Sequence, residues 1–554
     1  MLQPVMSPKR ASARSSTDRS VTSDTPDRFR GPRGLVPVIA VLAGGLAVAA
    51  AFPPLGLWWT APLGLSLLMG TLQGRGPWMS AGLGLVFGLA FFAPLLRFIA
   101  VAMGNPIGWV ALALFEALYM AVLGISWSLV SRMPVLTADG PGAGRAAGRV
   151  VSFAVLWCGV EELRSSWPWG GFPFGRLAFA MADAPMLSFA AYGGSIGLTL
   201  VVALIGACVL ETVCALRARA LMLALATTAC AGLAVAAPLV LPVDSAAEDG
   251  TLRVGAVQGN VAKDFEDAFN RALEVTDNHA QATDRLAADV GSGNLDVVIW
   301  PENAADLDPR THRSSATLID SAAQAAGAPI MVGAVLFEGD VRYNDMVVWT
   351  PGEGAGSYYR KHRPAPFAEY VPLRSLIRGL TTQVDRIGTD MAPGTGPQTL
   401  AIHAASQNRD VTLAMGICFE VAYDDTLRNG VRQGGELIVI PTNNASFLSS
   451  SEAAQQLAQG RVQAVVHGRS VVQVSTVGIT AIINPKGEVE QETRPYTQAS
   501  LVADAGLRTS MTPADTMGSW PGHVLCGCAA MLVIAGIVSS SVRRLVPGVD
   551  HRRR

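Results

Sequence analysis

The sequence predicts a polytopic α-helical membrane bundle of about eight spans that carries an extracytoplasmic α/β domain. Three observations lead to this prediction. Half of the 554 residues are hydrophobic and only 15% are charged, compared with about 25% in typical soluble proteins. The charged residues are concentrated in one long block, residues 251–510, which has the composition of a globular domain. The basic residues outside that block fall on one side of the predicted spans.

Eight apolar segments are candidates for membrane-spanning helices, which need about 17–25 mostly apolar residues. The fifth segment is the weakest candidate, because Glu161, Glu162 and Arg164 interrupt its end. The first resembles a signal peptide, but its basic leader is too long and further spans follow directly, so we interpret it as a retained helix. The predicted spans are 35–51, 56–73, 78–100, 107–130, 150–164, 189–214, 220–242 and 523–541.

The orientation follows from Lys and Arg, which are enriched in cytoplasmic connections. Residues 1–34 form a basic tail, whose Ser- and Thr-rich composition suggests disorder. If this tail is cytoplasmic, the seven spans in 35–242 place the polar domain, residues 243–522, outside the cytoplasm. The last span, 523–541, returns the chain to a basic cytoplasmic tail, 542–554. The even-numbered connections then hold the other basic residues: Arg75, Arg132, Arg145, Arg149, Arg217 and Arg219.

The polar domain alternates between apolar strands and helices, which indicates an α/β fold with covered sheets. The sequence contains no GxGxxG, P-loop or GxSxG motif and no metal-binding signature, so no cofactor is predicted. The net charge of −1 argues against nucleic acid as a partner. The predicted strands are 252–258, 296–300, 329–335, 343–349, 357–360, 411–417, 436–441, 471–475 and 479–484. The predicted helices are 264–290, 314–327, 423–433 and 452–467.

Three ionisable residues share one local setting, the end of a β-rich apolar run. They are Glu302, Lys361 and Cys418, and Cys418 is the only cysteine in the polar domain. Side chains at strand ends can converge at one edge of a sheet. A carboxylate can take the proton of a thiol, and an ammonium group can stabilise the thiolate and the oxyanion of a tetrahedral intermediate. The three together are a consistent set for nucleophilic catalysis.

Each of the three also has an alternative interpretation without catalysis. Cys418 is equally consistent with an inert buried cysteine. Glu302 follows Pro301 and is compatible with a helix cap. Lys361 lies among basic neighbours and is compatible with a solvated loop. The setting that the three residues share is what favours the catalytic interpretation.

The loop after the fifth span has charges beside Trp and Gly-Pro turns, from Glu161 to Phe174. On the outer face such a loop is a candidate site near the lipid headgroups. The alternative is an aromatic belt with charges that extend toward water.

Four motifs resemble the bacterial apolipoprotein N-acyltransferase family of the nitrilase superfamily. These are Trp300-Pro301-Glu302, the stretch 360–372 with its Pro-Phe-x-Glu-Tyr-Val-Pro pattern, Gly416–Glu420, and the outer-face loop between Glu162 and Pro173. The order of the motifs and the topology match over about residues 35–541. The resemblance implies a nitrilase-like αββα sandwich inserted between the seventh and eighth membrane helices.

The resemblance also implies roles for these residues. Glu302 would be the general base, Lys361 the oxyanion-stabilising residue and Cys418 the nucleophile, with Glu369 and Glu420 in support. Cys418 would take an acyl chain from a phospholipid donor and pass it to the diacylglyceryl-cysteine of a lipoprotein acceptor. The family resemblance further implies a monomer in the bacterial inner membrane.

The sequence departs from the family at two places. The family commonly has Asn-Asp-Ala-Trp-Phe where this chain has Asn443-Asn444-Ala445-Ser446-Phe447. The tryptophan that follows the Gln-Gly-Asn element has no clear counterpart, and Phe265 is only a possible substitute. Four residues are candidates for substrate contacts: Asn444, Ser446, Phe447 and Arg164.

Two other functions remain as alternatives. One is a membrane-tethered amidase of the nitrilase type that hydrolyses a small amide, which would not need eight spans. The other is a catalytically silent lipid-handling or scaffolding protein, which the intact Glu-Lys-Cys set disfavours.

Overall fold

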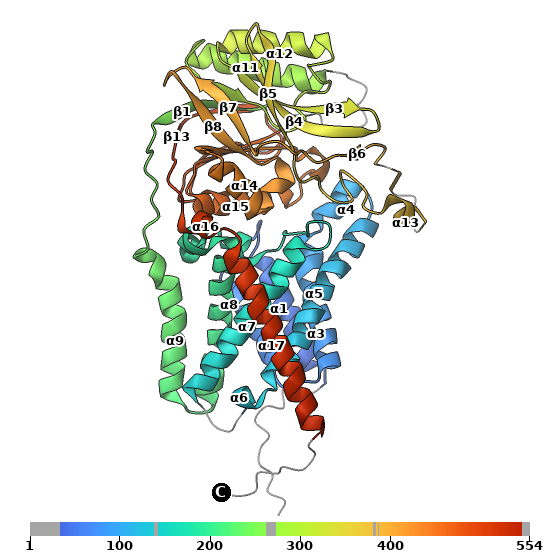
Figure 1. The fold of residues 1–554 in the computed structure, drawn as a ribbon, viewed down its shortest axis with the longest axis vertical. Helices are drawn as coiled ribbons and strands as arrows, with labels where there is room; N and C mark the ends of the chain where they lie inside the picture. The colour runs from blue at the N-terminus through green and yellow to red at the C-terminus, as the bar shows by residue number, and fades with distance from the viewer. Residues whose placement is uncertain (1–33, 138–141, 262–272, 380–383, 386, 546–554) are drawn as a thin grey trace, which may run out of the picture.

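The computed structural model describes residues 34–137, 142–261, 273–379, 384–385 and 387–545. Helices form one end of the molecule, and an α/β domain forms the other (Figure 1). Nearly all of both predicted basic tails, and Phe265, lie outside the described residues.

Each of the eight predicted spans contains a helix. Within the described residues, five helical segments are long and apolar enough to cross a membrane: 77–95, 107–131, 185–217, 221–239 and 520–542. The first two helices are shorter and the fifth carries charges, so the number of eight spans stays a prediction. The helices are α1 (Val36–Ala50), α2 (Thr60–Leu72), α3 (Pro77–Leu95), α5 (Ile107–Ser131), α7 (Ala143–Ser166), α8 (Ala190–Arg217), α9 (Leu221–Ala236) and α17 (Trp520–Leu545), with the short α4 (Phe98–Met103) and α6 (Pro134–Thr137).

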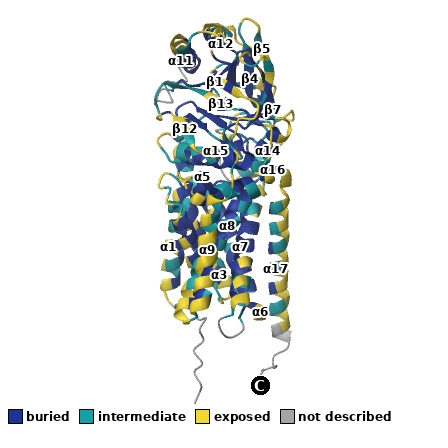
Figure 2. Ribbon diagram, turned by 90° about the vertical axis from the view of Figure 1, so that its left-hand side faces the viewer, coloured by how far each residue is buried: buried dark blue, intermediate teal, exposed yellow. Residues whose placement is uncertain are grey.

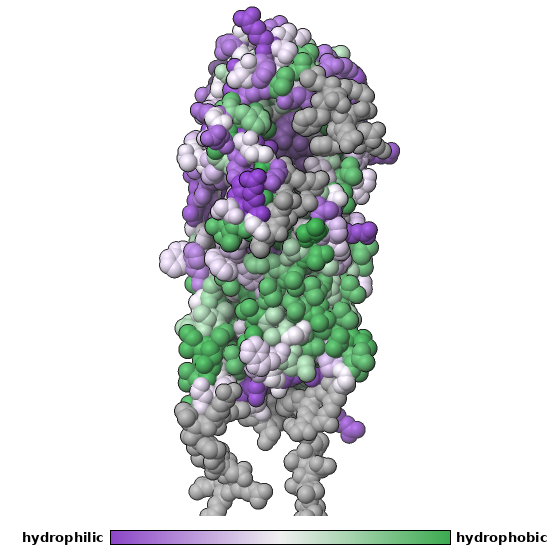
Figure 3. Space-filling view, turned by 90° about the vertical axis from the view of Figure 1, so that its right-hand side faces the viewer, coloured by the Kyte–Doolittle hydropathy of each residue, from purple (hydrophilic) through white to green (hydrophobic). Residues whose placement is uncertain are grey.

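The outer surface of this bundle is apolar. On the face that Figure 3 shows, the surface of the helices is mostly hydrophobic, whereas the α/β domain above it is mostly hydrophilic. Helices α9 and α17 leave most of their length exposed (Figure 2), and Met222 and Met531 are 80% and 63% exposed. An apolar surface this extensive is unfavourable in water and favourable in lipid. The prediction of a polytopic membrane protein is therefore confirmed.

The α/β domain contains two sheets packed face to face. One has the order β13-β1-β2-β3-β4-β5, with β6 beside β4, and the other has the order β12-β11-β10-β9-β8-β7. The first contains β1 (Thr251–Gln258), β2 (Val297–Ile299), β3 (Ile330–Glu338), β4 (Val341–Thr350), β5 (Gly354–Arg360), β6 (Asp390–Met391) and β13 (Ala499–Gly506). The second contains β7 (Thr399–Ala404), β8 (Arg409–Met415), β9 (Leu437–Thr442), β10 (Val471–Ser475), β11 (Ala481–Ile483) and β12 (Val489–Glu492).

Helices cover the outer face of each sheet. The first is covered by α11 (Glu274–Val290) and α12 (Arg313–Ala326), and the second by α14 (Asp424–Arg432) and α15 (Glu452–His467). Apolar side chains from both sheets, such as Leu252, Ile299 and Met415, are buried between them. The αββα sandwich is therefore confirmed. The predicted helix 264–290 is described only from Glu274, and the strands β6, β7, β12 and β13 were not predicted.

The second sheet's helical layer faces the membrane bundle (Figure 1). Helices α15 and α16 (Pro513–Met517) contact α8, and the short helix η6 (Ala445–Phe447) contacts α4. The short α6, in a connection predicted to be cytoplasmic, lies at the opposite end of the bundle. The nucleophile candidate Cys418 begins the 3₁₀ helix η5 (Cys418–Ala422) and so lies on the side of the domain near the bundle.

Candidate active site

Glu302 and Lys361 form a buried ion pair. Glu302 follows β2, Lys361 follows β5, and Lys361 Nζ lies 3.2 Å from Glu302 Oε1. Glu302 is 3% exposed and Lys361 is 1% exposed. Buried charges of this kind persist only where they are paired and hydrogen-bonded. The predicted convergence of these two strand ends is therefore found in the structure.

A second carboxylate completes the surroundings of the ammonium group. Lys361 Nζ donates to Glu369 Oε1 at 2.7 Å, and Glu369 Oε2 accepts from the Ala365 backbone N–H at 2.6 Å. Burial alone would lower the pKa of Lys361, but the charges of Glu302 and Glu369 outweigh burial and hold this pKa well above its ordinary value. The lysine is therefore a fixed cation, suited to stabilising negative charge.

Two asparagines that the sequence analysis missed fix the carboxylate of Glu302. The Asn344 side chain donates to Oε1 at 2.6 Å, and the backbone N–H of Asn443 donates to Oε2 at 2.9 Å. Asn344 lies in β4 between Tyr343 and Asp345, so its local sequence carries no signal that singles it out as a partner of Glu302. These contacts orient the carboxylate independently of Lys361.

The backbone of the nucleophile candidate adopts an uncommon conformation. Cys418 has a φ of 53°, in the left-handed region that residues other than glycine rarely occupy. Such conformations cluster at functional sites, where the surrounding structure holds them. Here the holding contact is Glu420, whose Oε2 accepts from the Ile417 backbone N–H at 2.8 Å.

Glu420 also ties this turn to the segment that carries Lys361. Its Oε2 accepts from the Tyr359 hydroxyl at 2.7 Å, and its Oε1 accepts from the backbone N–H groups of His362 and Arg363 at 2.8 and 2.9 Å. Four donors thus converge on one buried carboxylate. Because these donors flank both Lys361 and Cys418, Glu420 fixes the nucleophile turn relative to the lysine.

The thiol of Cys418 lies within the electric field of the other two residues. Burial raises its pKa, the charge of Glu302 raises it further, and the charge of Lys361 acts in the opposite direction. The result is a pKa well above the ordinary value for a thiol. The thiol therefore rests protonated, and a thiolate forms only when a nearby base takes the proton.

Comparison with known proteins identifies the family of this chain. Residues 44–208 match the model of the apolipoprotein N-acyltransferase N-terminal domain, and residues 253–509 match the carbon-nitrogen hydrolase model. The apolipoprotein N-acyltransferase of Mycolicibacterium smegmatis is 34% identical over 93% of this chain and 87% of its own length. The chain belongs to the apolipoprotein N-acyltransferase family. The enzyme of that name from Azotobacter vinelandii is 27% identical over 92% of this chain and 96% of its own.

Similar solved structures cover about half of this chain. One is an amidase of the nitrilase superfamily from Nesterenkonia, with 14% sequence identity and a TM-score of 0.36 over 50% of this chain and 98% of its own. Within the described part of this chain, no group of three or more His, Cys, Asp or Glu side chains is arranged to hold a metal ion.

One family position that was predicted to contact substrate, Asn444, lies in a buried network instead. Its amide donates to Glu452 Oε2 at 2.6 Å and to Gln456 Oε1 at 2.9 Å. Gln456 Nε2 in turn lies 3.7 Å from Cys418 Sγ. Burial and the nearby charge of Glu302 raise the pKa of Glu452 to about 8, although the Asn444 bond lowers it. Asn444 therefore positions Gln456, which contacts the thiol, and its buried side chain is not accessible to a lipid.

The other two positions in this element differ from each other. Ser446 is exposed, so it remains a candidate contact. Phe447 is half-buried and its ring lies 5.6 Å from that of Phe98 in α4. The ring of Phe98 also contacts that of Phe174, with 5.6 Å between their centroids. The ring of Phe174 in turn stacks on that of Phe419, which directly follows the nucleophile candidate. A row of aromatic rings thus connects the membrane bundle with the turn that carries Cys418.

Arg164 has a structural role in this protein, because its hydrogen bonds hold the loop that follows α7. It is buried, donates to Glu116 Oε2 at 2.8 Å and to the carbonyls of Phe172 and Phe174 at 2.6 and 2.7 Å. It fixes the loop that supplies the aromatic rings described above. The buried position of Arg164 does not support a substrate contact of its side chain. It also does not support the alternative interpretation, in which the charges of this loop extend toward water.

Proposed function

We propose that this protein transfers an acyl chain from a membrane phospholipid, through a thioester on Cys418, to the α-amino group of diacylglyceryl-cysteine at the N-terminus of a lipoprotein. The observation that carries the proposal is the buried contact of Lys361 with both Glu302 and Glu369, beside a protonated thiol at the membrane side of the domain. The names of the relatives that match along most of the chain give independent support.

In the first half of the reaction Glu302 takes the proton from Cys418 Sγ. The sulfur attacks the ester carbonyl carbon, and the Lys361 ammonium stabilises the oxyanion that forms. The ester C–O bond then breaks, and Glu302 returns its proton to the departing lysophospholipid oxygen. The product is a thioester at Cys418.

In the second half the neutral amine of the acceptor attacks the thioester carbonyl. Glu302 accepts a proton from the amine nitrogen, and Lys361 again stabilises the oxyanion. The C–S bond breaks because a thiolate leaves readily, and Glu302 reprotonates the sulfur. The acceptor becomes an amide and the enzyme returns to its starting state.

The surroundings suit two lipid substrates. An acyl chain held in an apolar surrounding would gain about 0.8 kcal/mol for each CH₂ group removed from water. An apolar surrounding would also limit water, the nucleophile that competes with the amine. In this proposal Glu369 holds Lys361, Glu420 holds the nucleophile turn, and the reaction needs no cofactor.

We further place the protein in the bacterial inner membrane as a monomer with eight spans and the α/β domain outside the cytoplasm. The basic residues of the predicted cytoplasmic connections support this orientation. The proposed divisions are residues 1–34, 35–242, 243–522, 523–541 and 542–554.

Intact mass spectrometry of the purified protein tests the proposal. The protein is incubated with a defined phospholipid and no acceptor. We expect an added acyl mass on the peptide that contains Cys418, and its discharge by a diacylated lipopeptide with formation of the amide. Cys418→Ala should give no adduct, whereas Cys528→Ala, which removes a cysteine from α17, should give a normal one.

The same experiment addresses the two alternatives. Absence of an adduct, together with release of ammonia or amine from small amides, would favour a tethered amidase. Activities that survive Cys418→Ala would favour a scaffolding role. No feature of the described residues specifically favours either function.

A further inference from the structure

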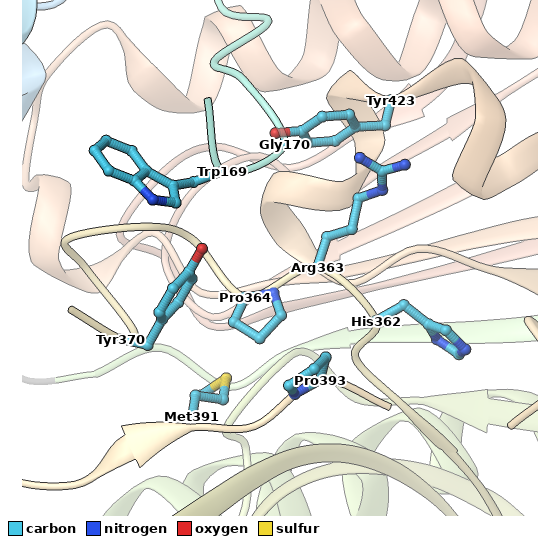
Figure 4. A pocket seen from close by; sticks show the side chains of 9 residues that line it. All are labelled: Trp169, Gly170, His362, Arg363, Pro364, Tyr370, Met391, Pro393 and Tyr423. Carbon is cyan, nitrogen blue, oxygen red and sulfur yellow. The ribbon is translucent and has the colours of Figure 1, made fainter. Parts of the chain in front are cut away.

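A cavity lies beside the candidate active site, between the α/β domain and the loop that follows α7. Its volume is about 300 Å³. Figure 4 shows Trp169, Gly170 and Tyr423 along one side of the cavity and Tyr370 and Pro364 on the other. No step of the proposed reaction uses this cavity.

The cavity is bounded by the same segments that carry the reactive residues. Pro364 lies three residues after Lys361, and Tyr370 directly follows Glu369. Tyr423 lies at the end of the turn that begins with Cys418, and its hydroxyl donates to the Gly171 carbonyl at 3.0 Å. The cavity is therefore joined to the nucleophile turn, to the lysine segment and to the membrane bundle.

The charge of the cavity lining does not favour an anion. Arg363 is the lining cation, but its guanidinium pairs with Asp425 and lies 4.4 Å from the centre of the Tyr423 ring. A phosphate group would have to compete with Asp425 for this side chain. An uncharged ligand would leave the pair intact.

The other lining groups fit an extended peptide. Aromatic rings and two prolines, Pro364 and Pro393, provide apolar walls. Within the described residues, the Tyr370 hydroxyl and the Trp169 indole N–H have no hydrogen-bond partner, so both can donate to peptide carbonyls. Trp169 is held in place by Phe367, whose ring lies 5.6 Å away. Grooves lined by aromatic residues are a recurrent means of binding extended peptide segments.

We infer that this cavity binds the first residues that follow the lipidated cysteine of the acceptor, as an uncharged extended segment. The inference rests on the proposed function. There the terminal amine must reach the thioester on Cys418 while the polypeptide leaves the site. A cavity that adjoins both the reactive segments and the membrane-side loop lies on such an exit path.

The test separates the two half-reactions. Acyl-enzyme formation is measured with phospholipid alone, and the preformed acyl-enzyme is then discharged by one of two acceptors. One acceptor is diacylglyceryl-cysteine amide without further residues, and the other carries four additional uncharged residues. The variants are Trp169→Ala and Tyr370→Phe, which removes only the hydroxyl. Trp167→Ala is the matched control, because Trp167 is 62% exposed in the same loop and does not line the cavity.

For Trp169→Ala we expect the concentration of the longer acceptor at half-maximal discharge to rise about tenfold, as for loss of an aromatic anchor. Tyr370→Phe should give a smaller rise. Acylation by phospholipid and discharge by the peptide-free acceptor should match those of the unaltered protein, and Trp167→Ala should change none of the three.

Three results would overturn the inference. Equal discharge of both acceptors in Trp169→Ala and in the unaltered protein would mean that the cavity does not bind the peptide. Slower acylation by phospholipid in the variants would assign the cavity to the lipid headgroup. If the unaltered protein formed no acyl-enzyme, the proposed function would fail and the inference with it, and this outcome is distinct from the other two.

Discussion

The carboxylate of Asp424 accepts two hydrogen bonds from Ser195, at 2.9 Å from the backbone N–H and at 2.7 Å from the hydroxyl. Asp424 begins α14, and Ser195 follows Gly194, where α8 departs from helical geometry with a φ of 69°. A side-chain acceptor at such a break satisfies an N–H group that has no partner within the helix. The contact therefore joins the α/β domain to the membrane bundle six residues after Cys418.

Asp424→Ala should destabilise this junction. The change leaves the Ser195 donors without their acceptor and removes the carboxylate that lies 3.9 Å from the Arg428 guanidinium. We expect a loss of about 2–4 kcal/mol in the free energy of unfolding, measured by thermal unfolding in detergent. Asp183→Ala is the control, because the Asp183 side chain is 64% exposed and its pair with Arg461 should contribute less than about 1 kcal/mol. Equal losses in both variants would contradict this prediction.

The same contact should weaken in acid. Burial alone would raise the pKa of Asp424, but Arg176, Arg428 and Ser195 more than offset burial, so the pKa of this carboxyl in the folded protein is below the ordinary value for an aspartate. A lowered folded-state pKa stabilises the protein above the unfolded-state pKa, and this contribution is lost as the pH falls through the folded-state value. The difference in melting temperature between the unaltered protein and Asp424→Ala should therefore be full at pH 7 and shrink below about pH 4.

The pH dependence of Cys418 alkylation should reveal how Glu302 and Lys361 affect the pKa of this thiol. Since the pKa of Cys418 is well above the ordinary value, the rate of alkylation by iodoacetamide should keep rising with pH and show no plateau near pH 9. Glu302→Gln removes a charge that raises this pKa, so its profile should move to lower pH. Lys361→Met removes a charge that lowers the pKa, so its profile should move higher. Identical profiles for all three proteins would rule out the electrostatic coupling.

Tyr359→Phe tests the role of the Glu420 carboxylate. The variant removes the 2.7 Å bond from the Tyr359 hydroxyl and leaves a buried carboxylate oxygen with one donor fewer. We expect a loss of about 1–2 kcal/mol in stability together with a lower rate of acyl-enzyme formation. The neighbouring Tyr358 is 50% exposed, so Tyr358→Phe serves as the matched variant and should change neither quantity.

Gly171→Ala and Gly170→Ala form another matched pair. Both residues have positive φ, of 74° and 89°, so alanine strains the backbone at each. A Cβ at position 171 would lie 2.2 Å from the Ser165 carbonyl carbon, whereas at 170 the nearest atom is 3.8 Å away. Gly171→Ala should therefore lower the melting temperature more than Gly170→Ala. A reversed order would mean that the loop moves to accommodate the new methyl group.

Hydrophobic patterning predicted much of the architecture, because whether a segment forms a helix or a strand depends largely on residues that are close in the sequence. Each predicted apolar segment contains a helix, and α12, α14 and α15 lie close to their predicted bounds. The strand β12 was not predicted because it is largely unburied and carries little apolar patterning, and most residues of β13 are only partly buried. Their places in the sheets depend on pairing with distant strands, such as β13 with β1.

In the candidate site, too, some residues could be predicted from local sequence and others could not. Glu302, Lys361 and Cys418 could be selected from the sequence, because each charged or nucleophilic residue closes an apolar run. Asn344, Gln456 and Glu452 could not, since nothing in their local sequence points to Glu302 or Cys418. Asn444 was expected at a lipid contact and is instead buried, because its amide is needed by Glu452 and Gln456.

The sequence was sufficient to predict the membrane bundle and the α/β class of the domain, and to propose Glu302, Lys361 and Cys418 as candidate catalytic residues. The balance of the buried charges became visible in the folded protein, where Lys361 lies between two carboxylates and the Glu420 carboxylate accepts four hydrogen bonds. The physical reason is that periodicity and residue type act over a few neighbours, whereas electrostatic energy depends on distances between groups that are far apart along the chain.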